Sequence, residues 1–257
     1  MSIKKSNIKR DVIVQKYRRI QLMPKKQKNK RNKETTNPVA LVTLMDQSSP
    51  ISEQYRTIRT NIRFASSSDH EIKTVVITSS GPGEGKSTTS ANLSVVFANS
   101  GQKVLLIDAD LRKPTVHKTF NLVNNVGFSN LLSTKEKVVN LIQQTSVPNL
   151  HVLTSGPKAP NPSELLGSSR MEQVLQELRE EYDFVIFDMP PIVAVTDAQI
   201  MASKVDGTLM VIREDVSRKE SLYKARDLLG MVNANVLGAV YHGAKNASDQ
   251  GYYYYGS

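Results

Sequence analysis

The sequence contains no cysteine, which excludes a disulfide framework, thiol chemistry and cysteine-ligated metal sites. This absence agrees with a reducing compartment, where disulfides are rare. No apolar run has the length of a membrane-spanning helix, and the longest, such as Val104–Ile107 and Val185–Phe187, are the size of buried strands. No signal peptide is recognisable. We therefore expect a soluble, cytoplasmic protein whose contact with a membrane is peripheral or goes through a partner.

The net charge of +10 comes from one end of the chain. Residues 1–39 hold 13 Lys or Arg and two acids, whereas the remaining residues hold 21 Lys or Arg and 22 acids. Segments such as 25–31 (KKQKNKR) have too little apolar content to form a core, so we expect this basic arm to be disordered. It is suited to anionic lipid or nucleic acid, or it is a solvated tail. Its bases do not alternate with aromatic residues as in a stacking platform, so we do not expect nucleic acid as a partner.

Strand and helix patterns alternate after a linker at residues 38–50, and the length suits one large α/β domain with appendages. This alternation predicts a mostly parallel β-sheet flanked by helices. Two of the helices are expected to begin at Ser169 and Ser217, because Glu172 and Glu220 follow at the spacing of a capping box. The other expected helices are 52–64 and 86–99, and the expected strands are 74–78, 103–108, 149–153, 184–188, 208–212 and 236–241.

The segment Ser79–Thr88 (SSGPGEGKST) predicts a phosphate-binding loop, because it follows a strand and opens a helix. Backbone N–H groups and the helix N-terminus there would surround phosphate oxygens. Lys86 would reach the β- and γ-phosphates of ATP, and Ser87 would offer its hydroxyl to Mg²⁺. Ser80 replaces the first glycine of the usual pattern, and a plain strand-to-helix turn is the alternative. The expected ATP-binding residues are Gly81, Gly83, Glu84, Gly85, Lys86, Ser87 and Thr88.

Acidic residues end two of the expected strands. Asp108 and Asp110 lie in LLIDADLRKP, and Asp188 ends the strand before Pro190 and Pro191. The carboxyl ends of parallel strands meet at one edge of a sheet, where α/β proteins bind ligands. Carboxylates at that edge could hold Mg²⁺ through water and accept a proton from a hydroxyl. Each segment alone could be an ordinary acidic strand end, but three motifs in this order argue against coincidence.

Four consecutive tyrosines, Tyr252, Tyr253, Tyr254 and Tyr255, lie two residues from the end of the sequence. Nothing after Val240 is suited to burying four adjacent rings. Taken alone, they fit a disordered tail or a short edge strand. Together with an upstream ATP site, they favour a flexible tail that the protein phosphorylates itself.

These motifs together resemble the bacterial tyrosine kinases (BY-kinases), cytoplasmic P-loop kinases of capsule and exopolysaccharide synthesis that are unrelated to eukaryotic protein kinases. The resemblance runs from about Ser52 to the end of the sequence. It rests on residues 81–88, 105–114 and 185–191 and on the terminal tyrosines. The segment 160–166 (PNPSELL) is also similar to the family, although we assign it no chemistry.

The resemblance implies ATP- and Mg²⁺-dependent phosphorylation of tyrosines in other proteins and in the tail of a neighbouring subunit. Carried over by position, Lys86 binds the phosphates, and Ser87, Asp108 and Asp188 belong to the Mg²⁺ site. Asp108 and Asp110 form the acidic pair that activates the tyrosine hydroxyl, and which of them is the base stays open. The implied division is a basic arm and linker over 1–50, a P-loop kinase domain over 51–242 and a tyrosine tail over 243–257.

Glu53, Arg56 and Arg59 match the E-x-x-R-x-x-R helix of the family. Their spacing alone predicts a solvated helix face, whereas the resemblance implies contact with the next subunit of a ring-like homo-oligomer. It also implies a separate membrane activator that holds the kinase at the inner face of the cell membrane, and a cognate tyrosine phosphatase.

Two other functions compete with this interpretation. A partition or septum-placement ATPase of the P-loop class would carry a lysine five residues before the loop lysine, where this chain has Gly81, and would lack the tyrosine run. A nucleic-acid-binding module that uses the basic arm would leave the acidic motifs unexplained.

Overall fold

A computed structural model of the protein describes residues 14–16, 37–66 and 71–243. The tyrosine cluster 252–255 and most of the basic arm lie outside these ranges. Within them, eight strands form one sheet in the order β1-β8-β7-β2-β6-β3-β5-β4, and every neighbouring pair is parallel except β4 and β5. This confirms the predicted mostly parallel sheet. The strands are β1 Val14–Lys16, β2 Thr74–Ser79, β3 Val104–Asp108, β4 Gln143–Gln144, β5 Leu150–Leu153, β6 Phe184–Asp188, β7 Gly207–Arg213 and β8 Val236–His242.

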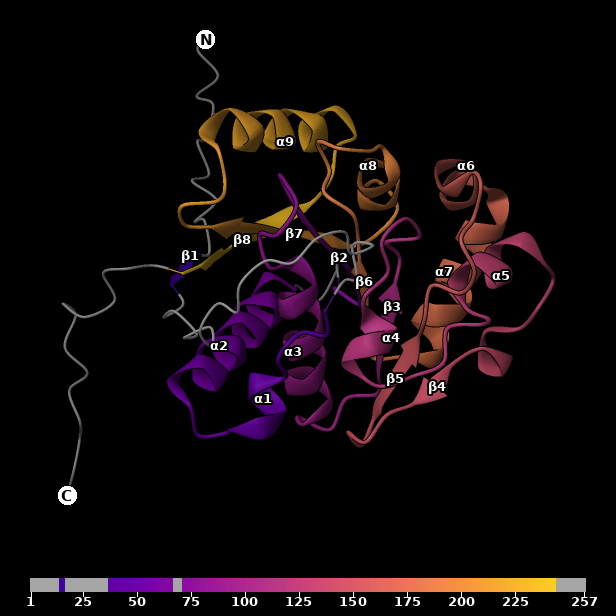
Figure 1. Ribbon diagram of the computed structural model, residues 1–257, viewed down its shortest axis with the longest axis horizontal. Helices are drawn as coiled ribbons and strands as arrows, with labels where there is room; N and C mark the ends of the chain where they lie inside the picture. Colours follow the sequence, from indigo (N-terminus) through magenta and orange to yellow (C-terminus); the bar gives the residue numbers. More distant parts are fainter. Residues whose placement is uncertain (1–13, 17–36, 67–70, 244–257) are drawn as a thin grey trace, which may run out of the picture.

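Helices cover both faces of the sheet (Figure 1). One face carries α1 Val42–Met45, α2 Pro50–Ala65, α3 Lys86–Ala98 and α4 Val116–Thr119. The other carries α5 Phe128–Ser133, α6 Pro162–Gly167, α7 Ser169–Glu181, α8 Asp197–Ala202 and α9 Lys219–Met231, and the 3₁₀ turn Val138–Asn140 lies between α5 and β4. None of the described helices is long and apolar enough to cross a membrane.

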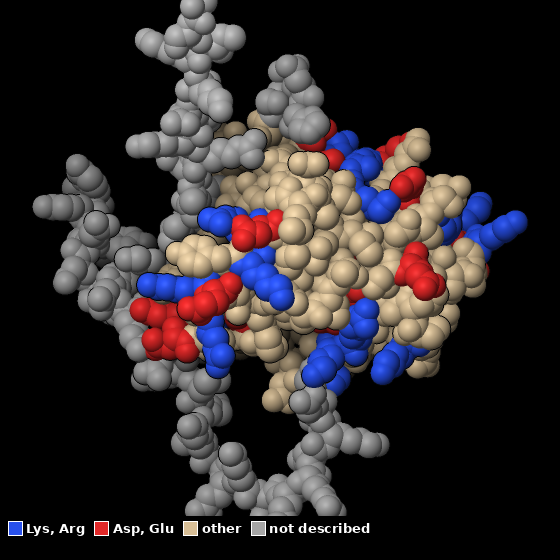
Figure 2. All heavy atoms as spheres, turned by 90° about the horizontal axis from the view of Figure 1, so that it is seen from above, with Lys and Arg blue, Asp and Glu red and all other residues tan. Residues whose placement is uncertain are grey.

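The interior strand β3, which lies between β6 and β5, shows why helices pack on both faces of the sheet. Its side chains alternate between the faces, so that Leu105 and Ile107 belong to one apolar cluster and Val104 and Leu106 to the other. Strands buried on both faces carry nearly continuous apolar runs, which is the pattern of parallel sheets. Over the face seen in Figure 2, basic and acidic side chains are interspersed, in keeping with the nearly balanced charge of the sequence after the basic arm.

Two helices start at other residues than predicted, and a third starts as predicted but with another cap. The helix α2 begins at Pro50 because Ser49 caps it, its hydroxyl accepting the N–H of Ser52 at 3.2 Å. The helix α7 begins at Ser169 as predicted, but its cap is Ser168. The prediction for Ser217 was wrong, because α9 begins at Lys219 and the Ser217 hydroxyl accepts the N–H of Arg213 at 2.9 Å instead.

The segment 38–50, expected as a linker, contains the short helix α1. Its Thr43 is buried, and both its N–H and its hydroxyl donate to the side-chain oxygen of Asn92 on α3 at 3.0 Å. These bonds hold the chain before α2 against the helix that follows the phosphate loop.

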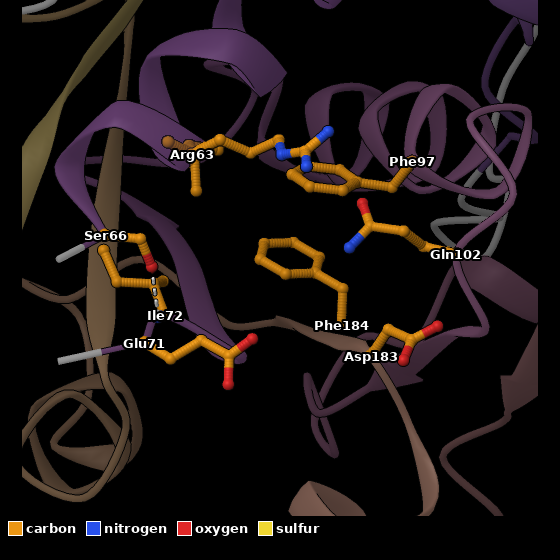
Figure 3. A pocket seen from close by; sticks show the side chains of 9 residues that line it. Arg63, Ser66, Glu71, Ile72, Phe97, Gln102, Asp183 and Phe184 are labelled. Carbon is orange, nitrogen blue, oxygen red and sulfur yellow. Dashed lines mark hydrogen bonds between the residues drawn. The ribbon is translucent and has the colours of Figure 1, made fainter. Parts of the chain in front are cut away.

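A hollow of about 400 Å³ lies near the amino ends of the strands, between the ends of α2 and α3 and the start of β6 (Figure 3). Two of the residues that line it, Phe97 and Phe184, stack with their ring centroids 3.8 Å apart. The phosphate loop and the acidic motifs follow the carboxyl ends of the strands, so this hollow is at the opposite edge of the sheet from them.

Candidate active site

The phosphate loop connects β2 to α3, as predicted. Gly83 and Gly85 have φ angles of 76° and 102°, in the left-handed region that favours glycine. Gly85 is also the N-cap of α3, which starts at Lys86. Backbone N–H groups of the loop therefore lie at the N-terminus of a helix, where partial positive charge attracts phosphate.

Glu84 braces the loop from the inside. Its carboxylate is buried and accepts the N–H of Ser80 at 2.9 Å and the Ser80 hydroxyl at 2.7 Å. Ser80, which departs from the usual glycine, therefore has a partner within the loop. The Glu84 side chain is committed to this contact, so that any contribution to nucleotide binding would come through its backbone N–H.

The acidic motif after β3 folds around its two carboxylates. Asp108 accepts the N–H groups of Thr115 and Val116 through Oδ2, both at 2.9 Å. Asp110 accepts the N–H of Lys113 at 3.0 Å, and its Oδ2 lies 3.7 Å from Lys86 Nζ. The structure thus brings the predicted loop lysine and the second acidic motif together.

Asp188 joins this group from β6, where it is the register partner of Asp108. Its Oδ1 accepts the hydroxyl of Ser90 at 3.1 Å. Among the described residues, Asp108 Oδ1 and Asp188 Oδ2 are buried oxygens that lack a hydrogen-bond partner. Such atoms in the interior call for a ligand, water or ion.

Burial raises the pKa of both acids. The pKa of Asp188 rises to about 6, against the opposing effects of Lys86 and of a hydrogen bond from Ser87. The pKa of Asp108 rises well above its ordinary value through burial and through the neighbouring charge of Asp188. A bound cation would stabilise the ionised forms of these two adjacent buried carboxyl groups.

The donors fit Mg²⁺, which prefers oxygen ligands and keeps several waters. Ser87, Asp108 and Asp188 would hold it, in part through water. No cluster of three or more acidic, histidine or cysteine side chains in the described part of the chain could hold a metal ion. Phosphate oxygens and water would therefore have to complete the coordination.

A salt-bridge network that the sequence did not reveal supports the acidic motif. Arg112 donates to both carboxylate oxygens of Asp197, at 2.9 and 3.0 Å, and Ser163 donates its hydroxyl to Asp197 at 2.8 Å. The network ties the loop after β3 to the starts of α6 and α8. It gives Ser163 of the PNPSELL segment, which had no assigned chemistry, a structural role.

Two more residues outside the predicted set contact the phosphate loop. Arg213, at the end of β7, donates from Nη1 to the carbonyl of Gly83 at 3.0 Å. His242, at the end of β8, places Nε2 2.8 Å from the hydroxyl oxygen of Thr89. Burial and the charge of Arg213 lower the pKa of His242 to about 4, so the ring is neutral at neutral pH.

The residues predicted for subunit contact lie on α2, and their described contacts are within the chain. Arg56 pairs with Glu53 and also donates to the carbonyl of Gln47. Arg59 donates from Nη1 to the carbonyl of Val96 on α3 at 3.1 Å. The structure does not join them to the acidic cluster.

The sequence is similar to curated proteins that are named tyrosine-protein kinases. A family model described as an AAA domain matches residues 72–222. Tyrosine-protein kinase YwqD of Bacillus subtilis (strain 168) is 50% identical over 217 residues, which are 84% of this chain and 91% of that protein. Putative tyrosine-protein kinase CapB of Staphylococcus aureus is 46% identical over 207 residues, 80% of this chain and 90% of that protein.

Solved structures of similar proteins have the same fold. The kinase domain of Escherichia coli tyrosine kinase ETK superposes with a TM-score of 0.77 at 32% identity, covering 86% of this chain and 87% of that one. The chimerical protein CapA2B2 gives 0.76 at 42% identity, with 79% and 89% covered. The septum site-determining protein MinD of Pyrococcus horikoshii OT3, complexed with Mg-ADP, gives 0.57 at 23% identity over 66% of this chain and 70% of that one, and shows a shared fold alone. Motifs, architecture and relatives agree: the chain belongs to the bacterial tyrosine-protein kinase family.

Proposed function

We propose that this tyrosine kinase transfers the γ-phosphoryl group of ATP to Tyr252, Tyr253, Tyr254 and Tyr255 of another copy of the chain. One observation carries the proposal: the phosphate loop, Lys86 and two buried carboxylates with unpartnered oxygens converge at one edge of the sheet. The tail supplies an acceptor of the chemistry that the family phosphorylates.

In the proposed reaction the loop N–H groups and Lys86 hold the β- and γ-phosphates. The tyrosine oxygen attacks the γ-phosphorus while the bond from that phosphorus to the bridging oxygen of ADP breaks. Asp108 or Asp110 accepts the phenolic proton, because a free tyrosine hydroxyl has a pKa near ~10 and is a poor nucleophile when protonated. Bound Mg²⁺, held by Ser87, Asp108 and Asp188, would neutralise negative charge on the phosphate oxygens.

The cellular role is proposed from the resemblance and from the named relatives. We infer a ring-like homo-oligomer in which Glu53, Arg56 and Arg59 of α2 contact the next copy. A separate membrane activator would recruit the kinase to the inner face of the membrane, and a phosphatase would reverse the tail modification. The process served would be capsule or exopolysaccharide synthesis, with further tyrosine-containing proteins as substrates. The basic arm and linker 1–50, the kinase domain 51–242 and the tail 243–257 would be the working parts.

A mixing experiment tests both the acceptor and the copy that acts on it. The Lys86→Met variant keeps the tail but should lose phosphate binding, whereas a variant with phenylalanine at 252–255 keeps the site. Incubated with MgATP, each alone should leave residues 252–255 without phosphate. The mixture should place phosphate on the tail of the Lys86→Met chain, as read by mass spectrometry of isotope-labelled protein. Absence of phosphate from 252–255 in the parent would refute the proposal.

A further inference from the structure

The phosphate loop is held from outside by the ends of two strands on the side away from the acids. In the sheet, β6 and β3 lie on one side of β2, and β7 and β8 lie on the other. The acids Asp108 and Asp188 end the first pair of strands, and Arg213 and His242 end the second. The loop after β2 is therefore contacted from both sides.

Residues of β7 and β8 contact Gly83 and Gly85, the two glycines of the phosphate loop that have positive φ angles. Arg213 reaches the carbonyl of Gly83. The ring of His242 lies against Gly85 so closely that a Cβ built there would be 3.1 Å from Nε2. These are the positions where the loop backbone has the most freedom, because glycine places little restriction on φ and ψ.

A hydrogen-bond chain connects His242 to the loop as well. The Thr89 hydroxyl lies 3.0 Å from the carbonyl of Gly85 and 2.8 Å from His242 Nε2. When Thr89 donates to Gly85, the tautomer of His242 that carries Nε2–H donates to Thr89. The two strand ends are also joined to each other, since Arg213 and His242 are register partners and the N–H of Glu214 donates to the carbonyl of His242 at 2.9 Å. Arg213 and His242 therefore form one support.

We propose that Arg213 and His242 are positioning residues that hold Gly83 and Gly85 in the phosphate-binding shape, and thereby set the affinity for nucleotide through the loop. A glycine-rich loop without such contacts would have to be ordered by the ligand, which weakens binding. The inference deepens the proposed function and rests on its nucleotide site.

The test is calorimetric binding of MgADP to the full chain, combined with kinetics at varied ATP. His242→Ala and Arg213→Ala should each raise the Kd for MgADP and the KM for ATP by about threefold to tenfold, the range for loss of one hydrogen bond. kcat at saturating ATP should stay within about twofold. His242→Gln, whose amide can donate to Thr89 in place of Nε2–H, should restore most of the affinity.

Matched controls remove equivalent contacts elsewhere. His151 contacts the Tyr182 hydroxyl through Nδ1 at 2.9 Å, and Arg170 donates to the carbonyl of Glu136 at 2.7 Å. His151→Ala and Arg170→Ala should leave the Kd for MgADP unchanged, at a temperature well below every variant's unfolding midpoint. If His242→Ala does not fold, the Arg213→Ala and His242→Gln variants decide.

Three outcomes overturn the inference. The first is a Kd for MgADP within twofold of the parent in both alanine variants, or in Arg213→Ala alone if His242→Ala does not fold. The second is a lower kcat with an unchanged KM for ATP. The third is an equal loss of MgADP affinity in the control variants. A parent chain that fails to bind MgADP would instead refute the proposed function itself, so the two failures are distinguishable.

Discussion

Arg112 and Asp197 form an ion pair with two hydrogen bonds, which joins segments 85 residues apart in the chain. Asp197 is fully buried at the start of α8, whereas the Arg112 side chain is 39% exposed. The pair fixes the loop that carries Asp110, and with it the position of the carboxylate that faces Lys86.

Removing Arg112 should destabilise the fold, because Asp197 would keep only the Ser163 hydroxyl among its described side-chain partners. For Arg112→Ala we expect a loss of roughly 2 kcal/mol, below the 3–5 kcal/mol of fully buried pairs because Arg112 is partly exposed. Urea unfolding measures it. Arg226→Ala, which removes the exposed pair with Asp227, should change stability by less than about 1 kcal/mol. Equal effects of the two substitutions would contradict the role of Asp197 as a buried anchor.

A direct comparison of Asp108→Asn and Asp110→Asn would identify the catalytic base. Loss of a general base costs about 100-fold to 10,000-fold in rate, so we expect at least one variant to lose that much of kcat for phosphoryl transfer. Asp110→Asn should also change the KM for ATP, because it removes the carboxylate beside Lys86. Single-turnover transfer at saturating MgATP gives the answer. Retention of more than a tenth of the parent rate by both variants would argue against either acid as the base.

We expect ionised Asp188 to make the metal-free protein less stable at neutral pH. Its pKa is about 6 in the fold and near 3.8 in the unfolded chain, so its favourable contribution is present below pH 4 and lost as the pH rises through 6. Asp188→Asn cannot ionise and should be more stable than the parent at pH 7.5 by about 2–3 kcal/mol. At pH 4 and below, the difference should vanish.

Urea unfolding in a chelator at the two pH values tests this. His242 contributes in the opposite sense at low pH, because its lowered pKa removes stability as the pH falls from 6.5 through 4, but it is present in both proteins and cancels. MgADP should reverse the order at pH 7.5, since the parent gains more from binding. An Asp188→Asn variant that is no more stable than the parent at pH 7.5 would show that ionised Asp188 does not destabilise the folded protein.

Phosphorylation of the tail should weaken the assembly that presents it. Each phosphate adds roughly −1.5 to −2 charges, and several on adjacent tyrosines repel one another and nearby acids. We expect the phosphorylated protein to have a lower oligomer mass by light scattering than the variant with phenylalanine at 252–255. Identical masses for these two proteins would disprove the effect.

The strands and the loop were predictable because their signals are local. The strands β2, β3 and β6 each contain an unbroken apolar run, and Lys86 directly follows the glycines of residues 81–85. The proximity of Asp108 and Asp188 was predictable because parallel strands end at the same edge of the sheet.

The supporting contacts were not predictable, because each joins residues distant in sequence. Thr89 and His242 are 153 residues apart, and nothing near either residue signals the other. The helices α5, α6 and α8 have six residues each, too few for an apolar periodicity to stand out. Ser217 does not cap α9 because its hydroxyl accepts the N–H of Arg213 at the end of β7 instead.

The strand β8 ends with His242 against Gly85 of the phosphate loop, so the proposed acceptor tyrosines follow in sequence from a point beside that loop. Tyr252 lies nine residues beyond Gly243, so even a fully extended connection spans no more than about 30 Å from the edge of the nucleotide site. Each kinase would therefore carry its acceptor on a short tether rooted next to a catalytic centre. A short tether keeps the local concentration of tyrosine high, of millimolar order for flexible linkers. Within an assembled oligomer, the rate of self-phosphorylation should thus be insensitive to dilution until the oligomer itself dissociates.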